Sequence, residues 1–249
     1  MSCMDKTFDN ILKGKIKITQ FKSGFRYGFD TIFLAAFVNG FLKKYKKKKI
    51  SLADVGAGVG SISLVIAFKN INIKITAIEN NLQYLKTAEE NIINNNFQKN
   101  IELINSDIFN INKKLINNFD IVVSNPPFYK MENNKSKNKL KDVSKRIIDL
   151  NKWLDGSVKL LKDKGIIFLI FPTEILDQVL IFLSKKTGSF KIFPFWSNHK
   201  KSSKRIILYA IKGGSSPTEL MPGLKLYNNN GVITKKAKLL SEEGIFRFL

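Results

Sequence analysis

The chain has 249 residues, 44% of them hydrophobic, and a formal net charge of +22. This length and composition suit a globular protein with a full hydrophobic core and exclude an intrinsically disordered chain. The apolar runs are too short for a membrane span and the N-terminus lacks a signal-peptide pattern, so we expect a cytoplasmic protein. One cysteine and one histidine exclude a disulfide framework and argue against a zinc site, so we expect no metal.

The excess of basic residues favours a polyanionic partner such as nucleic acid. The chain has 42 lysines and arginines against 20 acidic residues. Lysine, asparagine, isoleucine and phenylalanine are abundant throughout, which is typical of an AT-rich genome, so part of the charge reflects composition. Three basic segments are candidate phosphate contacts, with solvated loops as the alternative. They are Lys43–Lys49, Lys135–Lys145 and Lys200–Arg205.

Short alternating segments between glycines at residues 1–29 predict a small hairpin. The apolar run over 32–38 predicts a helix with Asp30 at its N-cap. From residue 50 strands and helices alternate, which predicts an α/β fold with a doubly wound, mostly parallel sheet of seven strands. We expect the last two strands to form an antiparallel pair at the sheet edge. The expected strands are 50–55, 73–78, 101–104, 120–123, 165–171, 190–195 and 205–211, and the expected helices are 61–68, 81–95, 150–161 and 174–184.

The same pattern divides the chain into three regions. We expect a hairpin and helix extension over 1–49, an α/β core over 50–212 and a C-terminal extension over 213–249 that packs on the core. The break after residue 212 is a linker-like Gly-Gly-Ser-Ser-Pro segment. Residues 130–146 form a long polar loop, which is a length usual for functional or disordered loops. We expect a monomer.

The strand that leads to residue 123 stops abruptly at the segment Ser124–Phe128, whose sequence is Ser-Asn-Pro-Pro-Phe. Neither proline donates a backbone hydrogen bond, so the carbonyls of Asn125 and Pro126 are left free by the sheet. The prolines also hold those oxygens, the Asn125 amide and the Phe128 ring in a fixed orientation. Rigid acceptors beside an aromatic ring fit a planar molecule with an amino group, such as a nucleobase. A purely structural turn is the alternative for the motif taken alone.

A glycine-rich segment, Asp54–Gly60, follows the first strand of the core and leads into a helix. Glycines let the backbone turn tightly and approach a ligand, and the helix start offers unpaired N–H groups. The acid directly before the glycines favours a cationic group over a pyrophosphate. A glycine-rich turn without a ligand is the alternative.

Two further acids follow successive strands. Glu79 lies 19 residues after Gly60, close to the offset of about 20 at which an acid binds ribose hydroxyls in nucleotide folds. Asp107 follows the next strand and is able to accept a hydrogen bond from an adenine amine. Taken singly, Glu79 fits a helix cap and Asp107 a turn. Their place at neighbouring strand ends, with Asp54 and Asn125, favours one positively charged, adenosine-containing cofactor.

Together these motifs resemble the class I S-adenosylmethionine-dependent methyltransferases that act on amino groups, over residues 24–211. The segment Gly24–Thr31 and the tail over 212–224 are similar to the bacterial tRNA adenine-N6 methyltransferases that act on valine tRNA beside the anticodon. The resemblance implies S-adenosylmethionine as cofactor and S-adenosylhomocysteine as product. It implies that Asp54 and the glycines bind the methionine end of the cofactor, that Glu79 binds its ribose and that Asp107 binds its adenine. It also implies that the helix starting near Asp30 closes over the cofactor. The implied cofactor-binding residues are Asp54, Gly56, Gly58, Gly60, Glu79, Asp107 and Asp30.

The same resemblance implies that Asn125 and the Pro126 carbonyl accept the two hydrogens of the target amine, that Pro127 stiffens the motif and that Phe128 stacks on the target base. We therefore expect an enzyme that methylates an adenine in structured RNA, with tRNA as the expected substrate. Trp153 and Trp196 are expected in the core rather than against a base.

Four alternatives remain open. A guanine-N2 methyltransferase of ribosomal RNA has a similar motif, and DNA adenine is another substrate of the same chemistry. A protein glutamine-N5 methyltransferase also shares the motif, but only 49 residues precede the first core strand, which argues against its helical N-terminal domain. A non-catalytic RNA-binding module is the alternative outside enzymes.

Overall fold

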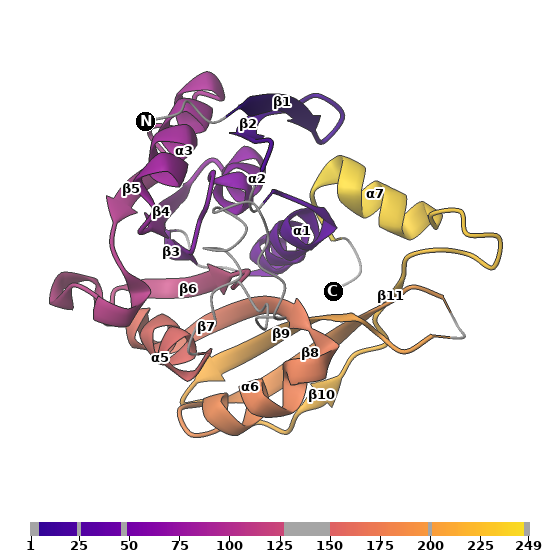
Figure 1. Ribbon diagram of the computed structural model, residues 1–249. Coiled ribbons are helices and arrows are strands. Elements are labelled where there is room, and N and C mark those ends of the chain that lie inside the picture. The colour runs from indigo at the N-terminus through magenta and orange to yellow at the C-terminus, as the bar shows by residue number, and fades with distance from the viewer. Residues whose placement is uncertain (1–4, 24–25, 46–48, 127–149, 199–200, 247–249) are drawn as a thin grey trace, which may run out of the picture.

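The computed structural model describes residues 5–23, 26–45, 49–126, 150–198 and 201–246. A central sheet carries helices on both faces, and a hairpin lies beside it (Figure 1). The hairpin strands are β1 (Lys6–Ile11) and β2 (Ile16–Phe21). The sheet strands are β3 (Ile50–Val55), β4 (Ile73–Glu79), β5 (Ile101–Asn105), β6 (Phe119–Ser124), β7 (Leu161–Pro172), β8 (Thr187–Trp196), β9 (Arg205–Lys212), β10 (Glu219–Leu220) and β11 (Leu224–Lys225). The helices are α1 (Phe29–Lys44), α2 (Ser61–Lys69), α3 (Leu82–Asn94), α5 (Leu150–Leu160), α6 (Leu176–Leu183) and α7 (Lys235–Glu243), with 3-10 turns η1 (Ile108–Asn110), η2 (Lys113–Leu115) and η3 (Thr173–Ile175).

The strand order confirms the expected doubly wound sheet. Seven long strands lie in the order β5-β4-β3-β6-β7-β9-β8, with β3 to β7 parallel and β9 antiparallel to both of its neighbours. Two further strands of two residues each, β10 and β11, pair with β8, so the central sheet has nine strands among the described residues rather than the expected seven. The sequence also predicts a short strand over 224–227, which agrees with β11, whereas β10 is too short to carry a periodic pattern.

The hydrophobic side chains of the strands alternate between two cores. In β7, Phe168 and Ile170 face one core while Ile167 and Leu169 face the other, all of them 0% exposed. The first core lies under α1, α2, the hairpin and α7, and the second lies under α5 and α6 (Figure 1). Burial on both faces explains why the sequence of β7 is a continuous apolar run.

The N-terminal hairpin is present as expected, with β1 antiparallel to β2. The helix after it begins at Phe29 and its N-cap is Gly28, so the prediction of Asp30 as the cap is wrong. Asp30 lies in the first turn instead, where its Oδ2 forms an ion pair with Arg205 Nε at 2.6 Å. Because β9 runs antiparallel to β7, its first residue lies at the carboxyl edge of the parallel strands, and this pair fixes the start of α1 at that edge.

The C-terminal segment packs on α1, because α7 lies against that helix and the Phe246 N–H donates to the Ala36 carbonyl at 2.8 Å. A Cβ at Gly40 would lie 2.2 Å from the Phe246 oxygen, so only glycine permits this approach. The sequence did not predict α7. The division into regions 1–49, 50–212 and 213–249 stays a prediction.

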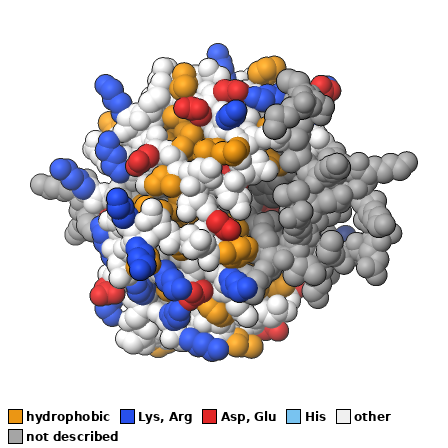
Figure 2. All heavy atoms as spheres, turned by 60° about the vertical axis from the view of Figure 1, so that its left-hand side comes forward, with side chains coloured by type: hydrophobic (Ala, Val, Ile, Leu, Met, Phe, Trp, Pro, Cys, Tyr) orange, Lys and Arg blue, Asp and Glu red, His pale blue; other side chains and the backbone are white. Residues whose placement is uncertain are grey.

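Several predictions from the sequence lie outside the described residues: Pro127, Phe128, the loop over 130–146, the segment Lys135–Lys145, and parts of the other two basic segments. On the face that carries β5 and α5, lysine and arginine side chains are spread widely with a few acidic ones among them (Figure 2). Within the described ranges, no helix is both long enough and apolar enough to cross a membrane.

Candidate functional site

The predicted site residues lie at the carboxyl ends of neighbouring parallel strands. The end of β3, Val55, lies beside Ser124 of β6 on one side and beside Ile78 of β4 on the other. Parallel strands end at the same edge of a sheet, and ligands of doubly wound sheets bind at that edge. The predicted residues that end or follow these strands are Asp54 (β3), Glu79 (β4), Asp107 (β5) and Asn125 (β6).

A turn of left-handed glycines follows β3. The φ angles are +72° at Gly56, +58° at Gly58 and +83° at Gly60, and a residue with a side chain adopts such values only with strain. A Cβ at Gly56 would lie 2.8 Å from the Trp153 ring, so the turn rests directly on that ring. A Cβ at Gly58 would meet no atom within 4 Å. The turn is therefore packed against the protein at Gly56 and open at Gly58.

Glu79 holds the open part of this turn. Its Oε2 accepts from the Gly58 N–H at 2.9 Å and its Oε1 from the Asn81 N–H at 2.9 Å. Burial raises the pKa of Glu79, and the hydrogen bonds from Asn81 and Gly58 oppose that rise. Asn81, not Glu79, caps α3 through its own side chain. An ionised carboxylate has about four acceptor positions, so Glu79 retains capacity for ligand hydroxyl groups.

Asp54 is 0% exposed and faces α2. Its Oδ2 accepts from the Ser63 N–H at 3.1 Å and the Ser63 Oγ–H at 2.7 Å. Its Oδ1 is buried and has no hydrogen-bond partner within the described part of the chain. Burial raises the pKa of Asp54 to about 7; the bonds from Ser63 oppose the rise and the charge of Glu79 adds to it. Asp54 therefore carries an unsatisfied acceptor at the end of β3.

A second buried carboxylate, that of Asp120, has the lysine partner that Asp54 lacks within the described ranges. Asp120, at the amino end of β6, accepts from Lys162 Nζ at 3.2 Å and from the Ser51 hydroxyl at 3.0 Å. Of the ion pairs formed between described residues, none involves Asp54 or Glu79. The glycine turn thus has a buried acid, Asp54, and a half-buried acid, Glu79, beside it, together with open space at Gly58 and an Asp54 oxygen that lacks a partner in the part of the chain that the structure describes. These features fit a ligand that carries a positive charge and hydroxyl groups.

Asn125 follows β6 directly and is half-buried, and Pro126 after it is buried. The strand end is fixed by Ser124, whose Oγ donates to the Val55 carbonyl at 2.8 Å and accepts from Trp153 Nε1 at 3.1 Å. These bonds join the start of the motif to the end of β3 and to the ring under the glycine turn. The structure therefore places Asn125 next to the turn, in a fixed backbone.

Asp107 caps a short helical turn, which is the alternative that the sequence left open for it. Its Oδ1 accepts from the Phe109 N–H at 2.9 Å and caps η1, and its side chain is exposed. Asp30 and Arg205 neutralise one another, so Arg205 does not present a free charge for phosphate. Lys201 and Lys204, in the same segment, are exposed.

The two tryptophans differ. Trp153 is 8% exposed, which confirms the expectation of a core residue, whereas Trp196 is 38% exposed and that expectation is wrong for it. Sequence reasoning missed the roles of Ser63, Ser124 and Trp153 at the site. Each of these side chains contacts a partner that only the tertiary fold brings close, so their roles could not be predicted from local sequence spacing. Across the described ranges, no group of three His, Cys, Asp or Glu side chains is placed to hold a metal ion.

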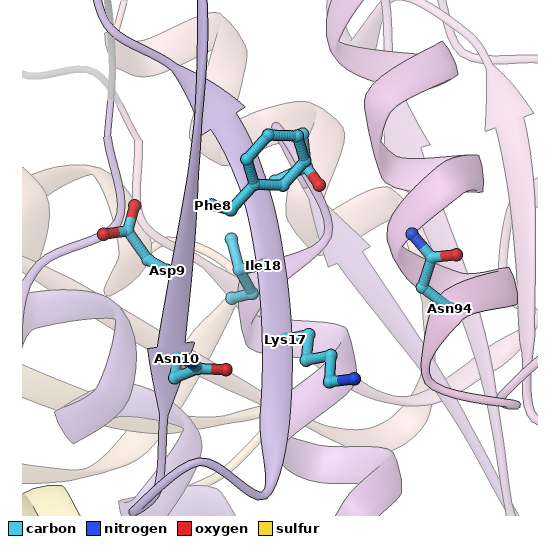
Figure 3. Close-up of a pocket in the computed structure, with 7 residues that line it drawn as sticks. Phe8, Asp9, Asn10, Lys17, Ile18 and Asn94 are labelled. Atoms are coloured by element: carbon cyan, nitrogen blue, oxygen red, sulfur yellow. The ribbon is translucent and has the colours of Figure 1, made fainter.

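A separate hollow of about 440 Å³ lies between the hairpin and α3, where Lys17 and Asn94 extend from opposite sides (Figure 3). None of the predicted site residues lines it. The residues that do are Phe8, Asp9, Asn10, Lys17, Ile18, Thr19 and Asn94. It lies away from the glycine turn, so we do not assign it to the expected cofactor.

Residues 35–187, more than half of the chain, match the model of the methyltransferase small domain family. The chain is similar to the tRNA1(Val) (adenine(37)-N6)-methyltransferase of Histophilus somni, with 26% identity over 237 residues that cover 93% of this chain and 94% of that protein. It is similar to the protein of the same name from Flavobacterium psychrophilum, with 24% identity over 182 residues that cover 72% and 74%.

Two solved structures share the fold. A crystal structure described as a predicted O-methyltransferase from Agrobacterium tumefaciens superposes with a TM-score of 0.70 at 18% identity, covering 87% of this chain and 97% of that one. The 16S rRNA N2 methyltransferase of T. thermophilus, in complex with AdoMet and guanosine, superposes with a TM-score of 0.58 at 20% identity, covering 85% and 51%.

Alanine substitutions separate packing from ligand binding at the turn. Gly58→Ala adds strain and a methyl group in open space, so we expect a modest loss of stability, about 1–2 kcal/mol, and at least ~10-fold weaker binding of S-adenosylmethionine by calorimetry. Gly56→Ala also clashes with Trp153 and should cost more stability. Gly14→Ala is the matched control, since Gly14 has a φ of +82° and nothing within 4 Å of an added Cβ. Gly58→Ala binding as tightly as Gly14→Ala would contradict this assignment.

The buried carboxyl of Asp54 predicts a pH-dependent stability. Because its pKa is raised from 3.8 to about 7 on folding, the folded chain holds a proton that the unfolded chain releases. The Asp54 contribution to the free energy of unfolding is therefore complete below pH ~4 and is lost as the pH rises toward 7. Asp54→Asn removes this loss. Relative to wild type, the variant should gain stability on the order of 2 kcal/mol between pH 5 and pH 8, measured by urea unfolding. Parallel pH profiles for the two proteins would show that Asp54 is ionised throughout.

Proposed function

Because the chain belongs to the methyltransferase small domain family, we propose that it transfers a methyl group from S-adenosylmethionine to the exocyclic N6 amine of an adenine in tRNA. The observation that carries the proposal is the position of Asn125 next to a glycine turn that has beside it a half-buried acid, Glu79, and a buried acid, Asp54, with an oxygen that is unpaired among the described residues. The relatives named tRNA1(Val) (adenine(37)-N6)-methyltransferase support an adenine beside the anticodon of tRNA(Val) as the target.

S-adenosylmethionine supplies a methyl group on a positively charged sulfur, and its adenosine carries ribose hydroxyls and an adenine amine. In the proposal, Asp54 and the turn Gly56–Gly60 bind its methionine end, where the two neighbouring acids Asp54 and Glu79 favour a cation. Glu79 accepts from the ribose hydroxyls while it holds Gly58, and the exposed carboxylate of Asp107 accepts from the adenine amine. Asp30, paired with Arg205, borders the same edge. The region over 50–212 would thus hold the cofactor, flanked by 1–49 and 213–249.

Asn125 and Pro126 act on the target base. The Asn125 side-chain oxygen and the Pro126 carbonyl accept the two hydrogens of the amine, which directs the nitrogen lone pair out of the ring plane toward the methyl group. Catalysis then rests on orientation and on charge placement rather than on a general acid or base. Pro127 and Phe128 complete the motif in the sequence, and an aromatic ring stacked on an unpaired base contributes ~1–3 kcal/mol.

The charge of the chain supports an RNA substrate. A net charge of +22 favours association with phosphates without selecting a sequence. Lys201 and Lys204 are exposed in the segment between β8 and β9, at the same edge of the sheet as Asn125. They are therefore the described lysines that we place closest to the RNA backbone in the proposal.

The test of the chemistry is Asn125→Ala. We expect calorimetric binding of S-adenosylhomocysteine within about twofold of wild type and methyl transfer reduced about 100-fold or more, because an unaligned amine loses its near-attack geometry. Asn118→Ala is the matched control. Asn118 is exposed and directly precedes the same strand, at the opposite end from Asn125. Unchanged turnover in Asn125→Ala would remove this side chain from the mechanism.

The test of the substrate uses labelled S-adenosylmethionine and total unmodified tRNA, followed by digestion and identification of the labelled nucleoside. We expect N6-methyladenosine, located beside the anticodon of valine tRNA. Labelled N2-methylguanosine, or label that appears only when ribosomal RNA is supplied in place of tRNA, would identify the guanine alternative. Cofactor binding without transfer to any RNA would favour the non-catalytic module.

A further inference from the structure

Two asparagines, Asn91 on α3 and Asn95 at the C-cap of that helix, bond to the free edge of β2. Asn91 Oδ1 accepts from the Thr19 N–H at 2.7 Å and its Nδ2 donates to the Thr19 carbonyl at 2.9 Å. One turn later Asn95 makes the same pair of bonds with Lys17, at 3.0 and 2.7 Å. Residues two apart in a strand are about as far apart as residues four apart in a helix, so the two asparagines match Thr19 and Lys17 in spacing. Each carboxamide bonds to both the N–H and the C=O of its strand residue, as a neighbouring strand would.

Asn91 and Asn95 differ in where their third bond goes. Asn95 Nδ2 donates within its own helix turn, to the Asn91 carbonyl at 2.7 Å, whereas the third bond of Asn91 leads out of the helix. Asn91 Nδ2 also donates to the Val59 carbonyl at 3.0 Å. Val59 lies between Gly58 and Gly60, within the turn that borders the proposed cofactor site. The Asn91 side chain is 1% exposed, so this amide joins the glycine turn to the hairpin in a dry environment, where hydrogen bonds are stronger than in water.

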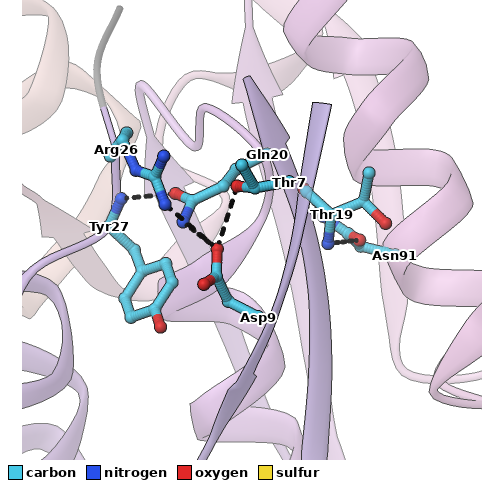
Figure 4. A network of polar contacts seen from close by, with 7 residues as sticks. All are labelled: Thr7, Asp9, Thr19, Gln20, Arg26, Tyr27 and Asn91. Carbon is cyan, nitrogen blue, oxygen red and sulfur yellow. Dashed lines mark hydrogen bonds and ion pairs between the residues drawn. The ribbon is translucent and has the colours of Figure 1, made fainter. Parts of the chain in front are cut away.

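The hairpin carries the connection further along the chain. Gln20, next to Thr19, accepts from the Tyr27 N–H at 3.1 Å and donates to Asp9 Oδ2 at 2.6 Å, which also accepts from Arg26 at 3.1 Å (Figure 4). These bonds hold the residues that lead into α1. The polar groups of Thr19 and Gln20 therefore connect the glycine turn on one side with residues 26–27 on the other.

The space beside this contact is not filled by side chains, since the hollow between the hairpin and α3 adjoins both Lys17 and Thr19 (Figure 3). This part of the β2 edge is therefore held against α3 by the asparagine bonds, while the end of β2 packs through the edge-on contact of the Phe21 and Tyr84 rings. Of the two bridges, only the one at Asn91 also contacts the turn.

We propose that Asn91 is a positioning residue that couples the glycine turn to the hairpin, so that binding of the cofactor and placement of the hairpin stabilise each other. The inference rests on the proposed cofactor site at the turn. Fixing the Val59 carbonyl restricts the flanking glycines to one arrangement before the ligand arrives, and a preorganised turn pays less entropy on binding. Any such coupling is reciprocal, so the ligand must also stabilise the Asn91–Thr19 bonds.

The variant test compares Asn91→Ala with Asn95→Ala. Both lose a two-bond bridge to β2, but only the first loses the bond to Val59. We expect Asn91→Ala to weaken calorimetric binding of S-adenosylhomocysteine about 10-fold and Asn95→Ala to leave it within about twofold. Amide exchange of residues 58–60 in the free protein should quicken in Asn91→Ala alone. Equal effects of the two variants on both readouts would overturn the proposal and reduce Asn91 to a structural tie.

A second measurement needs no variant, in case Asn91→Ala does not fold. In wild-type protein, saturating S-adenosylhomocysteine should slow exchange of the Thr19 amide about threefold or more and leave the Lys17 amide within about twofold, because only Thr19 bonds to Asn91. Equal protection of the two amides would contradict the coupling. If the wild type binds no S-adenosylhomocysteine, the proposed function fails. In that case, amide exchange of residues 58–60 in free Asn91→Ala, or in the milder Asn91→Ser, still shows whether Asn91 holds the turn in place.

Discussion

The site depends on one backbone constraint, the left-handed turn between β3 and α2. Three of its N–H groups bond to the neighbouring strand: those of Gly56 and Ala57 donate to the Ile78 carbonyl, and that of Gly58 donates to the Glu79 carboxylate. The position of the turn is thereby set by β4. Glu79 consequently has two tasks, because the same carboxylate that would meet a ribose also determines where the glycine beside it lies. A change in β4 must therefore move both parts of the site together.

The second organising feature is an imbalance of charge. A chain with 42 basic residues provides a lysine for buried Asp120 at the amino edge of the sheet, yet the described ion pairs leave Asp54 and Glu79 without one. Desolvation then raises the pKa of both acids. The free energy that an unpaired buried carboxylate costs in the free protein is recovered when a cation binds beside it. The apolar surroundings of Asp54 thus favour a charged ligand over a neutral one of the same shape.

The sequence predicted the sheet well because its central strands β6 and β7 are buried on both faces and most strands end at or just before glycine, asparagine or proline. The expected strand over 50–55 agrees with β3, and the motif residue Asn125 follows β6 as expected. Contacts between segments that are far apart in the sequence could not be predicted from it. Asp30 as a cap was wrong because its carboxylate pairs with Arg205, 175 residues away. Asn91 gave no signal, since an asparagine in a polar stretch of helix looks like a solvated residue until the hairpin is placed against it.

The match to the family model begins at residue 35, inside α1, and ends at residue 187, the first of β8. The hairpin, the first turn of α1, β9 and α7 lie outside it, yet they are not appendages. Thr19 of the hairpin bonds to Asn91 and so to the glycine turn, and Asp30 bonds to Arg205 at the carboxyl edge of the sheet. Substitutions in these outer segments therefore affect the geometry of the site through a small set of buried or paired side chains. The physical route from the periphery to the chemistry is a hydrogen-bonded one, and it passes through the amide of Asn91, which donates to the Thr19 and Val59 carbonyls at once.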